Sequence, residues 1–171
     1  LKILKKYYKS ENFKILNLIT LEWRRLKMLY KKKINKKKYT FHNDLHPHNI
    51  LITNNSKISA LDHRSLKLVN FEISLAYCLL KLCRQILSYK KNNIKENLSF
   101  QTIRKIKNKF NFFKFSNKVK IADLARIEIL NRIFFIFLKI RQNNYNYNFI
   151  LPVLLNNFFE AEEIFKDKKF Y

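Results

Sequence analysis

The sequence predicts an α+β fold that is mostly helical and contains one small β-hairpin. Five segments have the length and the apolar spacing that are typical of helices. Short runs rich in β-branched and aromatic residues lie together between the first and second of these segments. We therefore expect a helix, a small hairpin and then four helices, in a single domain of 171 residues.

The first predicted helix covers residues 13–30. Its apolar residues recur at three- and four-residue steps, which places them on one face. They are Leu16, Ile19, Trp23, Leu26 and Tyr30. A lysine-rich block at residues 31–38 then breaks the pattern, and we interpret it as a solvated loop. Residues 1–38 are thus expected to form an N-terminal helix and a basic linker.

The predicted hairpin lies between residues 39 and 61. Residues 39–41 are β-prone, and residues 50–53 and 57–61 form the two hairpin strands. The chain contains no glycine, so turns that need a positive φ must use Asn or Asp. We expect Asn54 and Asn55 to serve in this way in the hairpin turn.

Four more helices are predicted at residues 71–89, 100–115, 119–141 and 149–166. The apolar face of the first consists of Leu75, Cys78, Leu79, Leu82 and Ile86. The two cysteines, Cys78 and Cys83, match neither a zinc site nor a disulfide scaffold, and we interpret them as small buried side chains.

The formal net charge of +24 has two interpretations. A basic protein is attracted to nucleic acid, anionic membranes or phosphate-rich ligands. The abundance of Lys, Asn, Ile, Phe and Tyr, all encoded by A/T-rich codons, favours a compositional origin instead. We therefore do not expect nucleic acid as a partner. No apolar run is long enough for a transmembrane helix, so we expect a soluble, cytoplasmic domain.

Three polar residues around the hairpin carry the candidate chemistry. Asp44 lies in a polar loop, Asn49 begins the next strand, and Asp62 ends the second hairpin strand. A hairpin brings the residues at its open end together, so Asn49 and Asp62 are expected to be neighbours that face Asp44. Their oxygens are ligands that Mg²⁺ prefers, and a carboxylate beside a hydroxyl can accept its proton.

The segment HNDLHPHNIL at residues 42–51 resembles the catalytic loop of aminoglycoside phosphotransferases and choline kinases, often written HGDLHPGNIL. Ala60-Leu61-Asp62-His63 resembles the strand and aspartate that follow in that family. The resemblance implies a protein-kinase-like C-terminal lobe with a small hairpin around the catalytic loop. It implies Asp44 as the catalytic base, with His42 structuring the catalytic loop. It also implies Asn49 and Asp62 as the Mg²⁺ ligands that hold the phosphates of ATP.

The function implied by this resemblance is ATP-dependent phosphoryl transfer to a hydroxyl of a small molecule. Choline, thiamine or an aminoglycoside-like sugar would be the acceptor. The domain would divide into residues 1–38, the catalytic hairpin region 39–70, and a helical substrate-side part, 71–171. About forty residues precede the loop, and nothing in them resembles an N-lobe, so ATP would depend on a missing or separate N-lobe.

The resemblance is strong only over residues 39–63. Asn43 and His48 replace two glycines of the family pattern, and Asn70 and Ser74 replace two acidic residues. These changes leave open a non-catalytic remnant or pseudokinase that serves as a binding module.

Two weaker alternatives also stay open. The three histidines His42, His46 and His48 could bind a transition metal. The aromatic, lysine-rich segment at residues 110–115 could stack on nucleic-acid bases.

Overall fold

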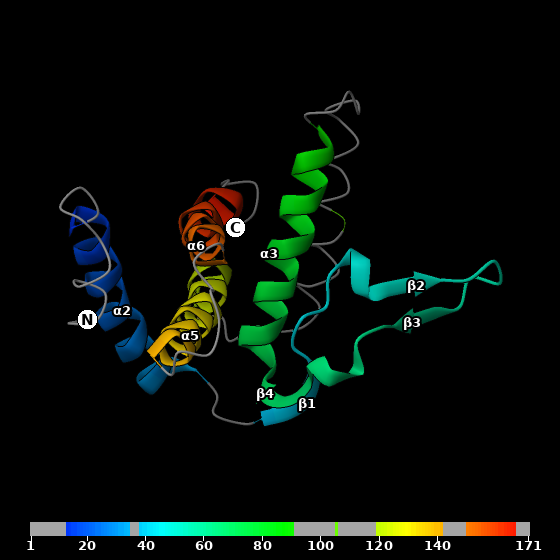
Figure 1. The fold of residues 1–171 in the computed structure, drawn as a ribbon, viewed down its shortest axis with the longest axis horizontal. Coiled ribbons are helices and arrows are strands. Elements are labelled where there is room, and N and C mark those ends of the chain that lie inside the picture. Colours follow the sequence, from blue (N-terminus) through cyan, green and yellow to red (C-terminus); the bar gives the residue numbers. More distant parts are fainter. Residues whose placement is uncertain (1–12, 35–37, 91–104, 106–118, 142–149, 167–171) are drawn as a thin grey trace.

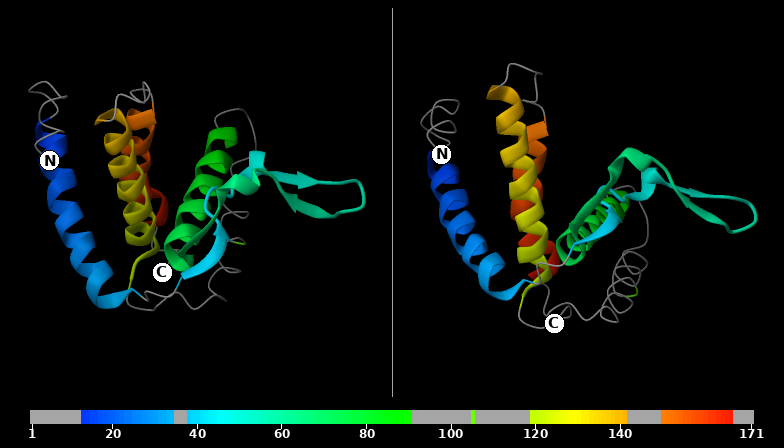
Figure 2. Two further views of the ribbon diagram at one scale, coloured as in Figure 1. Left: turned by 60° about the horizontal axis from the view of Figure 1, so that its bottom comes forward. Right: turned by 90° about the horizontal axis from the view of Figure 1, so that it is seen from below.

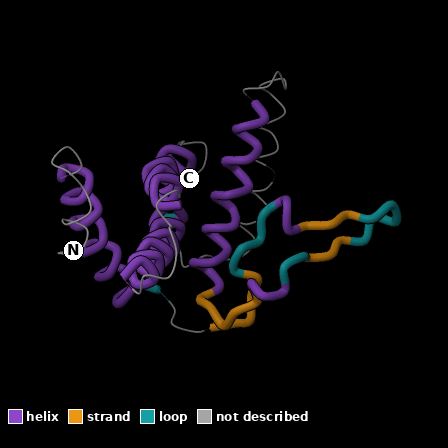
Figure 3. Tube along the Cα trace, in the orientation of Figure 1, coloured by secondary structure: helices purple, strands orange, loops and turns teal. Residues whose placement is uncertain are grey.

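The computed structural model describes residues 13–34, 38–90, 105, 119–141 and 150–166 of the chain. It is mostly helical with two small antiparallel sheets, so the predicted α+β class is confirmed (Figure 3). The elements are α2 (Phe13–Lys33), β1 (Lys38–His42), the short helix η2 (Pro47–Asn49), β2 (Ile50–Ile52), β3 (Ile58–Ala60), the short helix η3 (His63–Ser65), β4 (Leu66–Asn70), α3 (Phe71–Lys90), α5 (Ile121–Arg141) and α6 (Ile150–Lys166).

Four of the five predicted helices are confirmed as α2, α3, α5 and α6. The fifth, at residues 100–115, lies outside the described residues apart from position 105. The interpretation of residues 31–38 as a loop was wrong in part, because α2 continues to Lys33 and Lys38 already belongs to β1. No described helix has both the length and the apolar character needed to cross a membrane.

Helix α5 is the centre of the helical part. It packs against α6, α3 and α2, and both α2 and α6 lie beside it in Figures 1 and 2. Its side chains Leu124, Ala125 and Ile129 are fully buried. Every residue from 122 to 130 is buried, so this part of α5 needs neighbours on all sides, which explains its central position.

Helix α3 separates the helical part from the strands (Figure 1). The predicted core residues Leu75, Cys78 and Leu79 are buried, as expected. Burial extends around the helix to Ala76 and Leu80, because α3 contacts β1 and β4 as well as α5 and α6.

Both cysteines are free thiols in the interior, as the sequence predicted. Burial raises the pKa of the Cys78 thiol to about 11 and that of the Cys83 thiol to about 12. The thiols therefore stay protonated at neutral pH, which is typical of structural rather than reactive cysteines.

The core face predicted for α2 is correct only in part. Ile19 and Leu26 are buried, but Trp23 is 42% exposed. The Lys27 ammonium lies 4.7 Å from the centre of the Trp23 ring, a cation–π contact on the outer side of the helix. The periodicity placed Trp23 correctly beside its neighbours but did not show that the buried stripe is narrower than the apolar one.

A buried arginine links three of the helices. Arg126 on α5 is 6% exposed. Its Nε donates to the carbonyl oxygen of Phe158 at 2.9 Å, and its Nη2 lies 2.9 Å from the Glu162 carboxylate, both on α6. Its Nη1 lies 3.6 Å from the Glu22 carboxylate on α2. The guanidinium can be buried because these partners compensate for its lost hydration.

The strands form two separate two-stranded antiparallel sheets. The predicted hairpin is confirmed as β2 and β3, with Ile50 opposite Ala60 and Ile52 opposite Ile58. Strand β1 pairs instead with β4, from Lys38 opposite Asn70 to His42 opposite Leu66. The sequence analysis did not predict β4. Its pairing with β1 brings together the two ends of the segment 43–65, from which the hairpin projects (Figure 2).

Positive backbone φ angles occur at Ser56 (56°) and Asp62 (55°) among the described residues. The expectation that Asn54 and Asn55 would take this role was therefore wrong. The turn closes through hydrogen bonds from Thr53 N to Lys57 O at 3.0 Å and from Ser56 N to Thr53 O at 2.9 Å. Ser56 accepts a left-handed conformation that glycine would adopt with less strain.

Candidate active site

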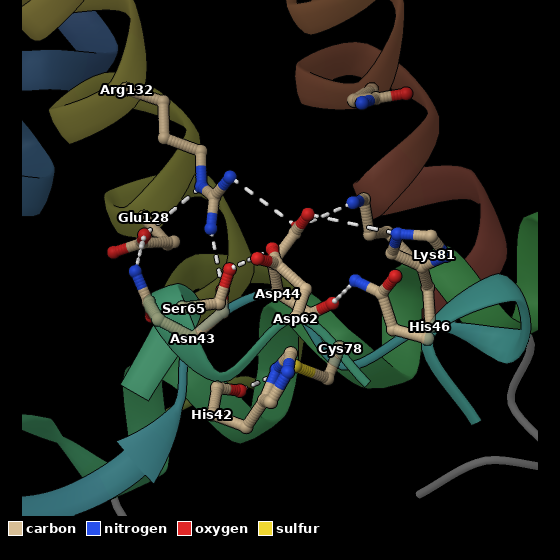
Figure 4. Close-up of polar contacts among 12 residues, drawn as sticks. His42, Asn43, Asp44, His46, Asp62, Ser65, Cys78, Lys81, Glu128 and Arg132 are labelled. Carbon is tan, nitrogen blue, oxygen red and sulfur yellow. Dashed lines mark hydrogen bonds and ion pairs between the residues drawn. The ribbon is translucent and has the colours of Figure 1, made fainter. Parts of the chain in front are cut away.

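The predicted catalytic loop connects β1 to β2 and lies against α3 (Figure 4). At its start, the Cys78 thiol of α3 donates to the carbonyl oxygen of His42 at 3.9 Å. At its end, Asn49 N donates to His46 O at 2.8 Å and forms the single turn η2. The loop is thus fixed at both ends by hydrogen bonds to its main-chain carbonyl groups.

His42 lies beneath this loop and is 6% exposed. Its Nε2 lies 2.7 Å from the carbonyl oxygen of Leu61, the residue before Asp62. Its Nδ1 has no hydrogen-bond partner among the described residues. The contact joins the start of the predicted catalytic loop to the end of the hairpin, so His42 acts on the backbone around the candidate site.

Two hydrogen bonds bring the predicted metal ligands and the predicted base together. Leu61 N donates to the carbonyl oxygen of Asn49 at 2.8 Å, which makes Asn49 and Asp62 neighbours across the open end of the hairpin. Asn49 Nδ2 donates to the carbonyl oxygen of Asp44 at 3.0 Å. The three residues therefore share one backbone framework.

Asp62 has a left-handed backbone and immediately precedes η3. Its carboxylate accepts from the Ser65 hydroxyl at 2.7 Å and from Arg64 Nε at 3.4 Å. The Ser65 hydrogen bond, together with Arg64, lowers the pKa of the Asp62 carboxyl. Because its pKa is lowered, Asp62 is ionised at neutral pH, as a metal ligand must be. Aspartate also adopts a left-handed backbone more readily than most residues other than glycine.

Asp44 is surrounded by cationic side chains from two distant helices. Its Oδ1 lies 2.5 Å from Lys81 Nζ on α3 and 3.5 Å from Arg132 Nη1 on α5. His46 Nε2 lies 3.6 Å from its Oδ2. Figure 4 shows these groups converging on the carboxylate from opposite sides.

This arrangement determines the ionisation of Asp44. Partial burial acts to raise the pKa of its carboxyl, but the hydrogen bond from Lys81 and the charges of Lys81, Arg132 and His46 outweigh burial and lower it. Burial and the nearby Lys81 lower the pKa of His46 despite the attraction of Asp44. At neutral pH the site therefore holds an Asp44 carboxylate beside a neutral His46.

Asn43, which stands where the pattern that residues 42–51 resemble has a glycine, is bound by three side chains. Its Nδ2 donates to Glu128 Oε1 at 3.0 Å, and its Oδ1 accepts from the Ser74 hydroxyl at 2.7 Å. Arg132 Nη2 donates to its carbonyl oxygen at 2.5 Å, and Arg132 Nε donates to Glu128 at 3.0 Å. Asn43 therefore fixes the position of Asp44 through side-chain bonds to both α3 and α5.

Asn70 and Ser74 stand where the pattern that the chain resembles has acidic residues, and Asn70, like Ser74, has a defined hydrogen-bond partner. Asn70 Oδ1 accepts from Ile73 N at 3.1 Å at the start of α3. Asparagine is as good as aspartate at the N-terminus of a helix, so this replacement keeps the cap.

A cavity of about 680 Å³ opens beside Asp44, within the range of small-molecule sites. Its walls come from the catalytic loop, from β4 with the turn before it, and from α3, α5 and α6. Asp44, Lys81 and Arg132 line it together with apolar residues such as Ile136 and Leu154. A small molecule in this cavity would lie next to the Asp44 carboxylate.

The histidines do not form a three-residue cluster. The His46 and His48 rings meet edge to face with centroids 5.5 Å apart, whereas His42 contacts Leu61 O. Among the residues that the structure describes, no group of three or more His, Cys, Asp or Glu side chains is arranged to hold a metal ion.

Sequence reasoning missed Lys81, Arg132 and Glu128, although all three reach the loop. The available signal was their position as charged residues within otherwise apolar stretches of α3 and α5. Such residues are expected to find partners when the helix is buried. The pattern alone does not identify those partners, which lie 37 to 89 residues away.

Comparisons of the chain with protein-family models, with curated proteins and with solved structures found no match.

Proposed function

We propose that this chain is the C-terminal lobe of a small-molecule phosphotransferase that moves the γ-phosphate of ATP to a hydroxyl group. The proposal rests on the hydrogen bonds that connect Asp44, Asn49 and the residue before Asp62. The bonds from Asn49 Nδ2 to the main-chain oxygen of Asp44 and from Leu61 N to Asn49 O link the backbone of the candidate base to that of the two candidate metal ligands. The sequence resemblance at residues 42–51 supports the same roles.

In the proposed reaction, the Asp44 carboxylate accepts the proton of the acceptor hydroxyl. The hydroxyl oxygen bonds to the γ-phosphorus, the bond from that phosphorus to the bridging oxygen breaks, and ADP leaves. Phosphoryl transfer depends mainly on positioning and electrostatic stabilisation. Lys81 and Arg132, which contact Asp44, supply positive charge close to the developing phosphate charge.

The residues present fit Mg²⁺. The Asp62 carboxylate is ionised, and the Asn49 amide nitrogen is committed to Asp44 O, which leaves the amide oxygen as the ligand atom. Magnesium commonly takes one or two protein oxygens and completes its shell with water and substrate phosphates. When bound, it would offset the negative charge of the ATP phosphates.

The test is Mg²⁺-dependent ADP release by the full-length protein, including any segment that supplies the N-lobe, across a panel of hydroxyl acceptors, with identification of the phosphorylated product. Asp44→Asn should lower kcat by about 100-fold or more, since general-base catalysis contributes factors of that order. Glu163→Gln, an exposed carboxylate on α6 outside the cavity, is the matched control and should retain full activity. Equal activity of Asp44→Asn and the unmodified chain would refute the base assignment.

A non-catalytic binding module is the second candidate, and one observation favours it. Lys81 Nζ lies 2.5 Å from Asp44 Oδ1. It occupies the position from which an acceptor hydroxyl would have to donate its proton to that oxygen. Under this alternative, small molecules bind in the cavity but no acceptor is phosphorylated, even when Lys81→Met frees the carboxylate. Turnover in either protein would exclude it.

A further inference from the structure

We propose that the cavity beside Asp44 takes an acceptor that carries an anionic group, a carboxylate or a phosphate, in addition to its hydroxyl. This inference rests on the proposed phosphotransferase function and specifies the acceptor class. It departs from the cationic acceptors that the sequence resemblance implies.

The cavity wall carries more positive than negative charge. Four cationic residues line it, and only two anionic residues, Asp44 and Glu128, do so. Both carboxylates are already paired within the protein. Asp44 contacts Lys81 and Arg132, and Glu128 accepts from Arg132 Nε at 3.0 Å. A cationic acceptor would therefore find no unpaired carboxylate among the residues that line the cavity.

The aromatic residues of the cavity wall already contact cations of the chain. Quaternary ammonium groups bind over aromatic faces. The cavity lining contains two aromatic rings, Tyr77 and Phe135. The Arg132 guanidinium lies 4.3 Å from the Tyr77 ring centre, and the Lys81 ammonium lies 5.5 Å from it. Lys139 Nζ lies 5.6 Å from the Phe135 ring centre. Cations of the chain itself thus already use both rings.

One lysine of the cavity wall, Lys67, has an ammonium group that can bind an anion. Lys67 on β4 lines the cavity, is exposed, and has no ion-pair partner elsewhere in the described part of the chain. Arg84 on α3 also lines it, held by Glu160 and Asn157 of α6. A carboxylate or phosphate held by Lys67, with Arg84 nearby, would receive charge-assisted hydrogen bonds. Its hydroxyl could then reach Asp44 across the same cavity.

Binding without nucleotide is the direct test. Glycerol 3-phosphate, glycerate, glycerol and choline form a series of small hydroxyl compounds that differ in charge, and inorganic phosphate reports on bare anion binding. Titration calorimetry with the chain should give at least roughly tenfold tighter binding for the two anionic hydroxyl compounds than for glycerol, as expected for one charge-assisted bond. Choline should bind more weakly than glycerol. Choline binding tighter than both anions would overturn the proposal.

Two variants localise the effect. Lys67→Glu should lower affinity for the anionic compounds by about tenfold or more and leave glycerol binding unchanged. Lys57→Glu is the matched control, because it makes the same charge change at an exposed position outside the cavity, near the hairpin turn. Equal losses in the two variants would mean that overall charge attracts the anions, and would refute the proposed site.

ATP is itself an anion and needs a separate measurement. If Lys67→Glu weakens ATP binding but not glycerol 3-phosphate binding, the cations serve the nucleotide, and the proposal fails.

Product analysis separates failure of this inference from failure of the proposed function. Phosphorylation of neutral or cationic acceptors alone would overturn the inference and keep the phosphotransferase. Selective anion binding that Lys67→Glu abolishes, without any phosphoryl transfer, would keep the anion site and overturn the phosphotransferase.

Discussion

The Ser74 hydroxyl donates a 2.7 Å hydrogen bond to Asn43 Oδ1, which joins α3 to the loop residue before Asp44. These are two of the positions at which the chain departs from the family pattern that it resembles. Glu128 accepts from the other end of the same amide at 3.0 Å, so the amide orientation is fixed. An ionised aspartate at position 74 could only accept hydrogen bonds and would face the amide oxygen. The two replacements are therefore complementary to one another.

Removal of this bond should destabilise the fold measurably. Ser74→Ala should lower the free energy of unfolding by about 1 kcal/mol, the usual net value of a buried hydrogen bond, and Ser74→Asp should lower it further. Urea denaturation of both variants provides the measurement. A double-mutant cycle with Asn43→Ala gives the coupling, and a coupling energy near zero would show that the two side chains do not act together.

The second prediction concerns the pH dependence of stability through Asp44. Because its pKa is lowered in the fold, the ionised carboxyl contributes stability above its unfolded pKa, and this is lost as the pH falls through the folded pKa. Lys81→Met removes the principal interaction that lowers this pKa. The stability that Asp44 contributes at neutral pH should therefore be smaller, and its loss on acidification should be smaller and end at a higher pH, which denaturation at a series of pH values would detect.

Two controls accompany the Lys81 measurement. Lys120→Met removes an exposed lysine that does not line the cavity and should leave the acid limb in place. Introducing Lys81→Met into an Asp44→Asn background should no longer move the acid limb, since the titrating group is gone. A persistent shift in that background would assign the effect to another carboxyl.

Asp62 allows the conformational and chemical roles of one residue to be separated. Asparagine tolerates the left-handed backbone at this position, whereas alanine does so less well. Asp62→Asn should therefore leave the urea midpoint of unfolding nearly unchanged, and Asp62→Ala should lower it measurably. Both should weaken Mg²⁺ binding, measured by Mn²⁺ substitution and paramagnetic broadening. Unchanged metal affinity in both variants would remove Asp62 from the ligand set.

Arg126 should be the costliest charged residue to remove from the helical core. Arg126→Ala leaves Phe158 O without its buried donor and deprives Glu22 and Glu162 of a common partner. We expect a loss of about 3 kcal/mol in the free energy of unfolding by urea. Arg24→Ala, an exposed arginine on α2, should change it by less than about 0.5 kcal/mol. Similar values for the two variants would contradict the structural role of Arg126.

The sequence predicted the parts of the site that depend on local structure. Asn49 and Asp62 could be placed together because a hairpin of ordinary turn and strand signals connects them. The four described helices followed from periodicity in the same way. Strand β4 escaped notice because its pairing with β1 depends on residues about thirty positions away, and because it runs directly into α3 without a turn signal.

The electrostatic surroundings of Asp44 could not be predicted, for a related reason. Lys81 and Arg132 reach it only because α3 and α5 pack together beside the loop. Nothing in the local pattern around either residue specifies that contact. The surroundings of Tyr77 could not be predicted from the local pattern either. Burial raises the pKa of its hydroxyl, and its ring lies beside both Lys81 and Arg132.

The hairpin closes through a main-chain hydrogen bond at its base, so the number of residues between Asn49 and Asp62 can vary without moving that base. The bond from Leu61 N to Asn49 O fixes the distance between the two candidate ligands at the base, while the turn at Ser56 lies at the far, exposed end. Insertions or deletions at such loop tips are generally tolerated. Related chains could thus gain or lose residue pairs at the tip, and so vary the spacing of Asn49 and Asp62 in sequence while keeping it constant in space.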